Sequence, residues 1–327
     1  MALPPSLLIR TAKTIWTTLW RTMMSQMAPS DKAGAYQRPQ SVFCDRIPSD
    51  NFPAEPKRYR LIVGMGCPWA HRTLIVRALK GLEQAIPITV VSPSGDEGYW
   101  VFDHPSPTDS LSCRTMPQFY AKAQSGYQGR ATVPVLWDGQ TNTIVNNESS
   151  EIIEILNVAF NDWATQPSLD LYPLELRADI DRWNEQIYHT VNNGVYRSGF
   201  AQTQTAYEEA CNQLFETLGM IDTTLTTHRY LCGDALTLAD VRLFTTLIRF
   251  DVAYYGLFKC NRQRIAEYEH LSGYVRDIYQ HPGVADTCDV DAIKRDYYGN
   301  LFPLNPGGII PLGPDLTNLT APHSRGR

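Results

Sequence analysis

The residue most able to do chemistry in this chain is Cys67, which lies where a β-like run meets a helix-like run. Residues 58–63 are typical of a strand, and Pro68 suits the first turn of a helix, where its missing N–H costs nothing. A cysteine just before such a helix faces unpaired backbone N–H groups and the positive end of the helix dipole, an environment that favours thiolate over thiol. We therefore predict that Cys67 is a nucleophile.

No second thiol accompanies Cys67 in its motif. The position at which the second cysteine of a redox pair would lie holds Ala70, so Cys67 cannot close its own disulfide and needs a thiol from outside. The other six cysteines are widely spaced, without the spacing of a disulfide framework or of zinc ligands. An odd count of this kind fits a reducing compartment, so we predict a cytoplasmic protein without a metal centre.

Length and charge restrict the classes of function. With 327 residues, 43% of them hydrophobic and 19% charged, the chain is long enough for two ordinary globular domains. Its net charge of -5 and its pI near 5.8 argue against nucleic acid as the main partner. We therefore predict a two-domain protein that does not act on nucleic acid.

Residues 1–57 are predicted to be an N-terminal extension with two parts. Residues 7–27 are apolar and basic, but three cations interrupt the run, so it is not expected to span a bilayer. We expect a helix here that docks on the body of the protein or on a partner subunit; a transit-like amphipathic segment is the alternative. Residues 28–57 are rich in Pro, Ser and Asp and are predicted to be an extended lead-in.

Residues 58–160 alternate between β-like and helix-like runs. The predicted elements are strands at 58–64, 86–91, 132–137 and 143–145 and helices at 68–82 and from 147 onwards. A long polar segment, residues 93–131, separates the second strand from the third and is predicted to be an insertion. The order β-α-β-loop-β-β-α is that of a thioredoxin-like α/β domain, which we predict for this region.

Pro134 stands near the start of a predicted strand, where proline is confined to an edge, a bulge or a special bend. In a thioredoxin-like fold, the peptide bond before this proline is cis and lies beside the active-site cysteine. We therefore expect a cis Val133–Pro134 bond, with the backbone of Val133 exposed for pairing with an extended peptide. An ordinary trans proline that starts an edge strand is the alternative.

The second half of the chain is predicted to be an all-α helical domain at 174–299. Apolar residues recur at steps of three and four in three stretches, 176–191, 207–225 and 238–248. Thr237 and Asp240 form a capping-box pattern at the start of the third stretch. Residues 300–327, with repeated Pro and Gly, are predicted to be a C-terminal tail.

Four sequence blocks together identify a family. They are residues 67–72 (CPWAHR), 192–201 (NNGVYRSGFA), 255–261 (YGLFKCN) and 305–306 (NP). In this order they resemble the xi class of glutathione transferases, the glutathionyl-hydroquinone reductases, over about residues 35–315. The resemblance implies a thioredoxin-like domain joined to a helical domain, glutathione as co-substrate, a homodimer and no metal.

The resemblance also implies a reaction. The Cys67 thiolate attacks the thioether sulfur of a glutathionylated hydroquinone, the hydroquinone leaves, and a mixed disulfide with glutathione remains. A second glutathione then releases oxidised glutathione and restores the thiolate. The alternatives are an omega-like thioltransferase or dehydroascorbate reductase, and a non-catalytic ligand-binding protein.

Further site residues follow from matching the family's motifs. Val133 corresponds to the position that binds the cysteinyl backbone of glutathione, and Trp100 to a tryptophan that contacts glutathione from the insertion. Ser149, at a helix N-terminus, is suited to a carboxylate, and Glu148 to the γ-glutamyl ammonium. Helix capping is the alternative role for Glu148 and Ser149.

Tyrosines are the candidates for handling the aromatic ring. Tyr196 lies in a helical segment flanked by glycines, which suggests space for a ligand, and its phenol is predicted to donate a proton or a hydrogen bond. Tyr254 and Tyr297 are companion candidates, with Tyr298 as the alternative to Tyr297; core packing is the competing role. His71 and Arg72, beside the cysteine motif, are expected to pack or to hydrogen-bond within the fold.

Overall fold

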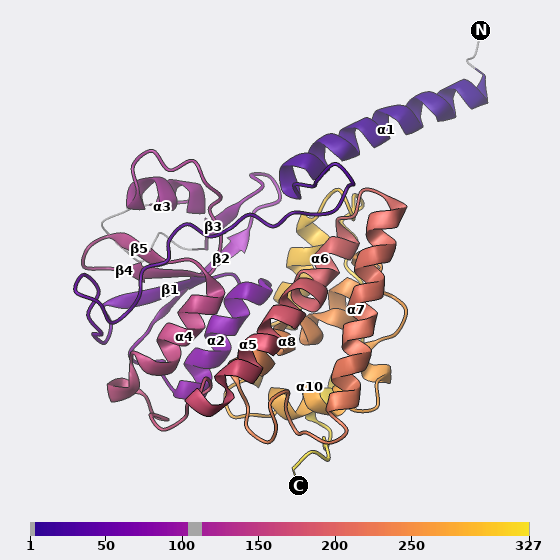
Figure 1. Cartoon of the computed structure of the whole chain (residues 1–327). Helices are drawn as coiled ribbons and strands as arrows, with labels where there is room; N and C mark the ends of the chain where they lie inside the picture. The colour runs from indigo at the N-terminus through magenta and orange to yellow at the C-terminus, as the bar shows by residue number, and fades with distance from the viewer. Residues whose placement is uncertain (1–3, 104–112, 327) are drawn as a thin grey trace.

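The computed structural model describes residues 4–103 and 113–326 and divides into two parts (Figure 1). A mixed sheet with helices on both sides forms one part, and a group of helices packed against one another forms the other. The predicted thioredoxin-like α/β domain followed by an all-helical domain is confirmed.

The sheet has five strands in the order β3-β2-β1-β4-β5. Their bounds are β1 (Tyr59–Val63), β2 (Ile88–Pro93), β3 (Trp100–Phe102), β4 (Val135–Asp138) and β5 (Thr143–Asn146). The central strand β1 runs parallel to β2 and antiparallel to β4, so that Leu61 pairs with Ile88 on one side and with Leu136 on the other. β-branched and aromatic residues dominate these strands, as expected for a buried sheet.

Helices α2 (Pro68–Lys80) and α4 (Ser149–Val158) pack together on one face of the sheet, and α3 (Met116–Ala123) lies on the other (Figure 1). α2 begins with proline and ends at Gly81, whose φ of 63° closes the helix in the left-handed conformation. α2 also contacts α8 of the helical domain, so one helix joins both parts of the molecule.

The predicted insertion carries structure of its own. It supplies the edge strand β3 and the helix α3, which begins at Thr115 with a complete capping box. Phe119 of α3 packs on Trp137 of the sheet with ring centroids 4.5 Å apart, which ties the insertion to the domain. Residues 104–112 of the insertion lie outside the described residues.

The helical domain contains α5 (Arg177–Ile187), α6 (Gly194–Gly199), α7 (Gln204–Thr224), α8 (Leu238–Arg249), α9 (Tyr255–Leu257), α10 (Leu271–Tyr279) and α11 (Val290–Lys294). π-helical segments span Tyr188–Asn192, Phe250–Tyr254 and Arg295–Gly299. Short 3-10 turns span Asn161–Trp163, Leu174–Leu176, Ile265–Glu267, Ala285–Thr287 and Thr317–Thr320. The predicted capping box is confirmed, because Asp240 accepts hydrogen bonds from the backbone N–H and the hydroxyl of Thr237.

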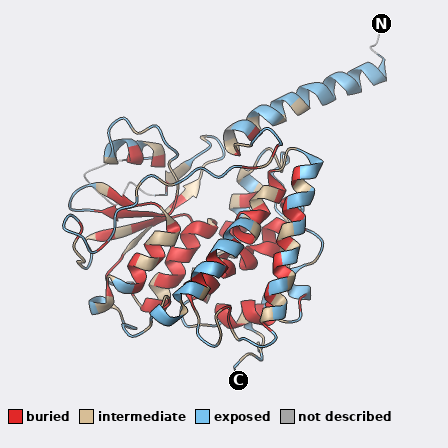
Figure 2. Ribbon diagram, in the orientation of Figure 1, coloured by how far each residue is buried: buried red, intermediate tan, exposed pale blue. Residues whose placement is uncertain are grey.

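α1 (Pro5–Met27) is a helix, as predicted, but most of its length does not dock on the body of the protein. It projects away from the other helices, and the side chains of its first turns are exposed (Figures 1 and 2). Only its C-terminal end reaches the core, where Met24 and Ala28 are fully buried. The first half of the helix therefore does not dock on the body, because the body ends beneath the last turns, and docking on a partner subunit stays a prediction.

Candidate active site around Cys67

Cys67 lies at the N-cap of α2, in the turn that leaves β1. Its backbone N–H donates to the carbonyl of Gly64 at 3.0 Å, and its own carbonyl accepts from the N–H of His71 at 3.0 Å, which begins the helix. The thiol is half-buried and donates to the carbonyl of Val133, with Sγ 3.7 Å from the oxygen. The predicted cis Val133–Pro134 bond is confirmed, so the cysteine and this bond lie side by side.

The electrostatics of Cys67 differ from the sequence-based expectation of a thiolate. Burial raises the pKa of the Cys67 thiol above its ordinary value, whereas the Ala70 N–H, the Arg249 guanidinium and the Trp69 N–H lower it only in part. The N–H groups at the helix N-terminus therefore lower the pKa of Cys67 as expected, but desolvation raises it by more. All seven cysteines lie in the described part of the chain, and none of them forms a disulfide.

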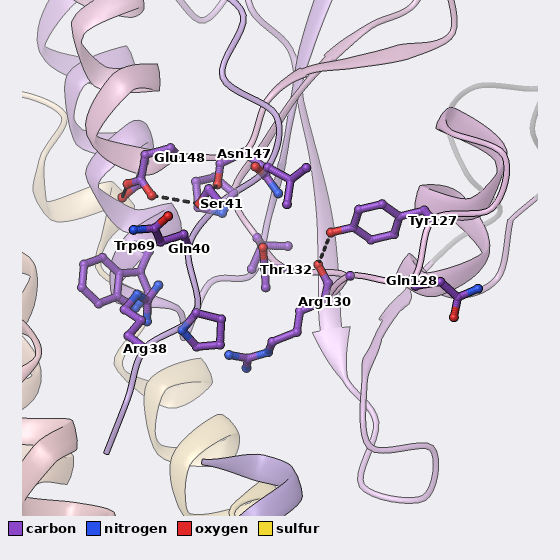
Figure 3. A pocket seen from close by; sticks show the side chains of 16 residues that line it. Arg38, Gln40, Ser41, Trp69, Tyr127, Gln128, Arg130, Thr132, Asn147 and Glu148 are labelled. Atoms are coloured by element: carbon purple, nitrogen blue, oxygen red, sulfur yellow. Dashed lines mark hydrogen bonds between the residues drawn. The ribbon is translucent and has the colours of Figure 1, made fainter. Parts of the chain in front are cut away.

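A cavity of about 270 Å³ lies near Cys67 (Figure 3). Cys67 is not part of its lining, but Val133, whose carbonyl accepts from the Cys67 thiol, is. The cavity is lined by lead-in residues 38–42, by residues 127–130 and 132–134, and by Trp69 and residues 147–149. The predicted residues Val133, Glu148 and Ser149 are all in this lining. Trp100 is not; its ring instead lies directly against Gly64, where it leaves no space for a side chain.

Glu148 and Ser149 form the N-terminus of α4 at the wall of this cavity. Burial alone would raise the pKa of Glu148, but hydrogen bonds from the Ser150 N–H and from the hydroxyls of Ser41 and Ser150 keep it below its usual range. Arg72 stands behind the pair, and its Nη1 donates to Ser149 Oγ at 3.3 Å. The wall therefore holds an ionised carboxylate next to a helix N-terminus supported by a buried cation.

The opposite wall of the cavity is basic. The guanidinium of Arg38 stacks over the Trp69 ring at 3.8 Å from its centroid, and Arg130 extends toward the same lead-in segment (Figure 3). The sequence-based reasoning did not find Arg38, Ser41 or Arg130. They lie in segments without periodicity, and nothing in the sequence indicates that the lead-in folds back across the end of α4.

Three tyrosine hydroxyls meet near Cys67, where the Tyr196 ring stacks on Trp69, two residues after the cysteine. We call this cluster the phenolic side of Cys67, and the cavity its charged side. The Tyr297 hydroxyl lies 2.5 Å from that of Tyr196 and 2.8 Å from that of Tyr254. Burial raises the pKa of all three phenols, and a charge on Cys67 would raise the pKa values of Tyr196 and Tyr254 further. The cluster therefore presents protonated, neutral donors at any pH near neutrality.

The structure distinguishes Tyr297 from Tyr298. Tyr297 is 6% exposed and joins the cluster, whereas the hydroxyl of Tyr298 points toward Gly256. Tyr254 and Tyr297 lie within π-helical segments, whereas Tyr196 lies in α6, the helix that follows the segment Tyr188–Asn192. A π-helical turn adds one residue to a helical turn and is frequent at functional sites. Two of these segments thus contribute a tyrosine to the cluster from distant parts of the chain.

Arg249, at the end of α8, crosses the domain boundary to hold the turn before Cys67. It is fully buried, and its guanidinium donates to the carbonyls of Gly66 at 3.0 Å and Met65 at 3.3 Å. It also donates to Nδ1 of His71 at 2.8 Å, so Nε2 of that ring carries the hydrogen given to Thr287. This network positions the Cys67 turn from the helical domain.

Asp296 holds the same turn from the C-terminal side. Its carboxylate accepts from the N–H of Gly66 and occupies the space that a side chain at position 66 would need. Burial raises the pKa of Asp296 to about 6. Neither Arg249 nor Asp296 was predicted; Arg249 lies on a core stripe and Asp296 beside a predicted tyrosine. His71 and Arg72 make the structural contacts that were expected of them.

Comparisons with known proteins identify the family. Residues 66–159 match the glutathione S-transferase N-terminal domain, and residues 204–277 match the corresponding C-terminal domain. The glutathionyl-hydroquinone reductase YqjG of Escherichia coli is 44% identical over 95% of this chain and 96% of its own length. PcpF of Sphingobium chlorophenolicum, which has the same activity in its name, is 46% identical over 92% of this chain and 94% of its own.

Solved structures agree with these relatives. The glutathione transferase Xi from Phanerochaete chrysosporium superposes with a TM-score of 0.83 at 46% identity, covering 87% of this chain and 94% of that chain. A glutathione-bound structure of YqjG superposes with a TM-score of 0.80 at 46% identity, covering 89% of this chain and 93% of that chain. This chain therefore belongs to the glutathione transferase family and, within it, to the xi class, the glutathionyl-hydroquinone reductases.

Proposed function

We propose that this protein reduces glutathionyl-hydroquinones to hydroquinones with glutathione, through a mixed disulfide on Cys67. The observation that carries the proposal is one thiol, without a partner thiol at Ala70, that contacts the wall of a polar cavity through Val133 and has a cluster of three phenols nearby. The relatives named glutathionyl-hydroquinone reductases support the same reaction.

The polar cavity suits glutathione, which carries two carboxylates and one ammonium group. Glu148 is placed to accept the γ-glutamyl ammonium, and Ser149 with the N-terminus of α4 to bind the adjacent carboxylate. The backbone of Val133 is placed to pair with the cysteinyl residue, which brings its sulfur to Cys67. Arg38 and Arg130 suit the glycyl carboxylate. Trp100, whose ring lies against Gly64 in the turn before Cys67, is proposed to contact glutathione from the insertion.

In the first half-reaction, the Cys67 thiolate attacks the sulfur that joins glutathione to the ring. The sulfur–sulfur bond forms, the bond from sulfur to the ring carbon breaks, and the ring leaves with the electron pair. The ring carbon gains a proton, so the aromatic product is reduced while the two sulfurs are oxidised to a disulfide. Attack on the keto tautomer of the ring, whose sulfur-bearing carbon already holds that proton, releases a phenolate rather than a carbanion.

The tyrosine cluster is placed to stabilise that leaving group. Tyr196, closest in role to a general acid, donates to the ring oxygen as negative charge develops, while Tyr297 and Tyr254 orient its phenol. Because burial raises the pKa of all three above its ordinary value, they remain donors near neutral pH. In the second half-reaction, glutathione attacks the mixed disulfide, and oxidised glutathione leaves.

We further propose a division of labour along the chain. Glutathione would bind to the thioredoxin-like domain, residues 58–160, and the ring to the helical domain, residues 174–299. The N-terminal extension, residues 1–57, and the C-terminal tail, residues 300–327, would flank these two domains. We propose a cytoplasmic setting, because the seven widely spaced cysteines fit a reducing compartment. We propose a homodimer, as the family resemblance implies.

The test is incubation of the protein with a glutathionyl-hydroquinone and glutathione, with free hydroquinone and oxidised glutathione measured by chromatography. We expect both products in equal amounts, and mass spectrometry of the enzyme without added glutathione should find one glutathione on Cys67. Faster turnover of a mixed disulfide or of dehydroascorbate than of the aromatic substrate would favour the omega-like activity. An enzyme inert on all three substrates would leave only ligand binding.

A further inference from the structure

The first half of α1 carries apolar side chains that no described residue covers. Leu8, Ile9, Ile15, Trp16 and Leu19 are between 47% and 68% exposed; we call them the apolar stripe of α1. Their separations of three, four and seven residues place them along one side of the helix. Single exposed apolar residues are ordinary, but a continuous exposed patch marks a contact surface.

The stripe continues a face that the rest of the helix buries. Farther along the same side, Trp20 and Met27 pack against the protein core. α1 is therefore anchored at its C-terminal end and extends its apolar face beyond the body that anchors it (Figures 1 and 2). The exposed half must be covered by something other than this chain's own described residues.

Charge indicates what covers it. α1 has three cations that lie away from the centre of the stripe; we call these, Arg10, Lys13 and Arg21, the basic side of α1. No acidic residue occurs before Asp31. The whole chain has a net charge of -5, so this helix is locally opposite in sign to the protein that bears it. A helix with cations opposite Trp and Leu, and without acids, is complementary to an anionic lipid surface.

Most hydroxyl groups of α1 have hydrogen-bond partners within the helix itself. Five hydroxyls donate to the helix's own carbonyls three or four residues earlier, at 2.8–3.0 Å; they belong to Thr14, Thr17, Thr18, Thr22 and Ser25. A hydroxyl satisfied in this way costs less to move out of water. The three cations are thus the main groups of the helix that require a polar phase, and phosphate headgroups supply one.

We propose that α1 lies in the surface of an anionic lipid bilayer, with the apolar stripe among the acyl chains and the basic side at the phosphates. No helix of the described residues is long and apolar enough to cross a membrane, so α1 would lie along the surface rather than span it. Trp16 suits the boundary between headgroups and acyl chains, where tryptophan is enriched.

This placement would bring the active site close to the lipid surface. The lead-in that follows α1 is fixed to the helical domain, since the Ala33 carbonyl accepts from Thr203 Oγ1 at 2.9 Å and that of Gly34 from the Gln202 N–H at 3.1 Å. A few residues later, Arg38 lines the cavity near Cys67. Given the proposed function, the enzyme would meet aromatic substrates that partition into the bilayer.

The test is flotation of the full chain with vesicles of phosphatidylglycerol and phosphatidylcholine, compared with phosphatidylcholine alone. We expect binding to the anionic vesicles, weakened by salt. Replacing Arg10, Lys13 and Arg21 together by Gln should weaken it about a hundredfold, at about fivefold for each cation. Ile15→Ser, Trp16→Ser and Leu19→Ser should each weaken it by about tenfold.

Matched controls keep this test independent of folding and of catalysis. Leu174→Ser and Leu312→Ser change side chains that are 76% and 99% exposed outside α1, and should leave vesicle binding unchanged. Reductase activity in lipid-free buffer should be equal in all variants, since none of them touches the site. Equal binding to both vesicle types, or no flotation, would overturn the proposal. The proposal would also be overturned if a stripe variant lowered the oligomeric mass in sedimentation without weakening vesicle binding. That result would mean that the stripe contacts a second copy of this chain.

Discussion

The two sides of Cys67 differ in the chemistry of their side chains. On the side of Val133, the cavity combines an ionised carboxylate, a helix N-terminus and exposed guanidinium groups, all suited to a charged peptide. On the other side, three neutral phenols hydrogen-bond to one another among aromatic rings. Under the proposed function, the charged side would recognise glutathione, which is the same in every substrate, and the phenolic side would act on the ring, whose bonding changes.

Removing the Cys67 thiol should abolish both half-reactions. Cys67→Ser is expected to lower turnover of glutathionyl-hydroquinone by ~10³-fold or more, because a hydroxyl does not replace a thiolate as nucleophile or form the mixed disulfide. Product release measured by chromatography and the glutathione adduct measured by mass spectrometry should disappear together. Cys44→Ser, which changes an exposed cysteine, is the control and should retain full activity. Persistence of turnover in Cys67→Ser would reject the mechanism.

Removing one phenol should slow the half-reaction that involves the ring and leave the other half-reaction nearly unchanged. Tyr297→Phe loses the hydrogen bonds to both Tyr196 and Tyr254, so we expect turnover of the aromatic substrate to fall by about a hundredfold. Resolution of a preformed Cys67–glutathione disulfide, measured by stopped-flow, should stay within about twofold because it involves no ring. Tyr298→Phe is the adjacent control. An equal loss in both half-reactions would mean that the tyrosines support the fold rather than the ring.

The two sides also differ in how far sequence could predict them. Cys67 belongs to a short local motif whose conformation is set by its neighbours, so it could be predicted from the sequence alone. Val133 and Glu148 lie at predicted element starts, but their roles came from matching the family's motifs. Tyr254 and Tyr297 were reached only through family resemblance. The π-helical segments change the helical register by one residue, so periodicity does not indicate which tyrosine faces the site. Arg249 could not be predicted, since its role depends on packing between domains.

A smaller effect is expected on the charged side. Glu148→Gln keeps the shape of the side chain but removes the negative charge, so the KM for glutathione should rise about tenfold with little change in kcat at saturation. Steady-state kinetics with varied glutathione measures this. Glu154→Gln, farther along α4 and paired with Arg46 at 2.9 Å, is the control and should leave KM unchanged. A fall in kcat without a change in KM would assign Glu148 to chemistry instead of binding.

The smallest effect concerns Asp296, which braces the turn between the two sides. Because its pKa rises to about 6 in the folded protein, from 3.8 for an unperturbed carboxyl, the folded state binds this proton more tightly than the unfolded chain. The protonated group favours folding below pH 4, and this contribution is lost as the pH rises through 6. Asp296→Asn keeps an oxygen for the Gly66 N–H but cannot ionise, so its free energy of unfolding relative to the wild type should improve by about 2 kcal/mol between pH 4 and pH 7. Urea unfolding at both pH values measures this difference, and a difference that does not vary with pH would show that Asp296 titrates in the same way folded and unfolded.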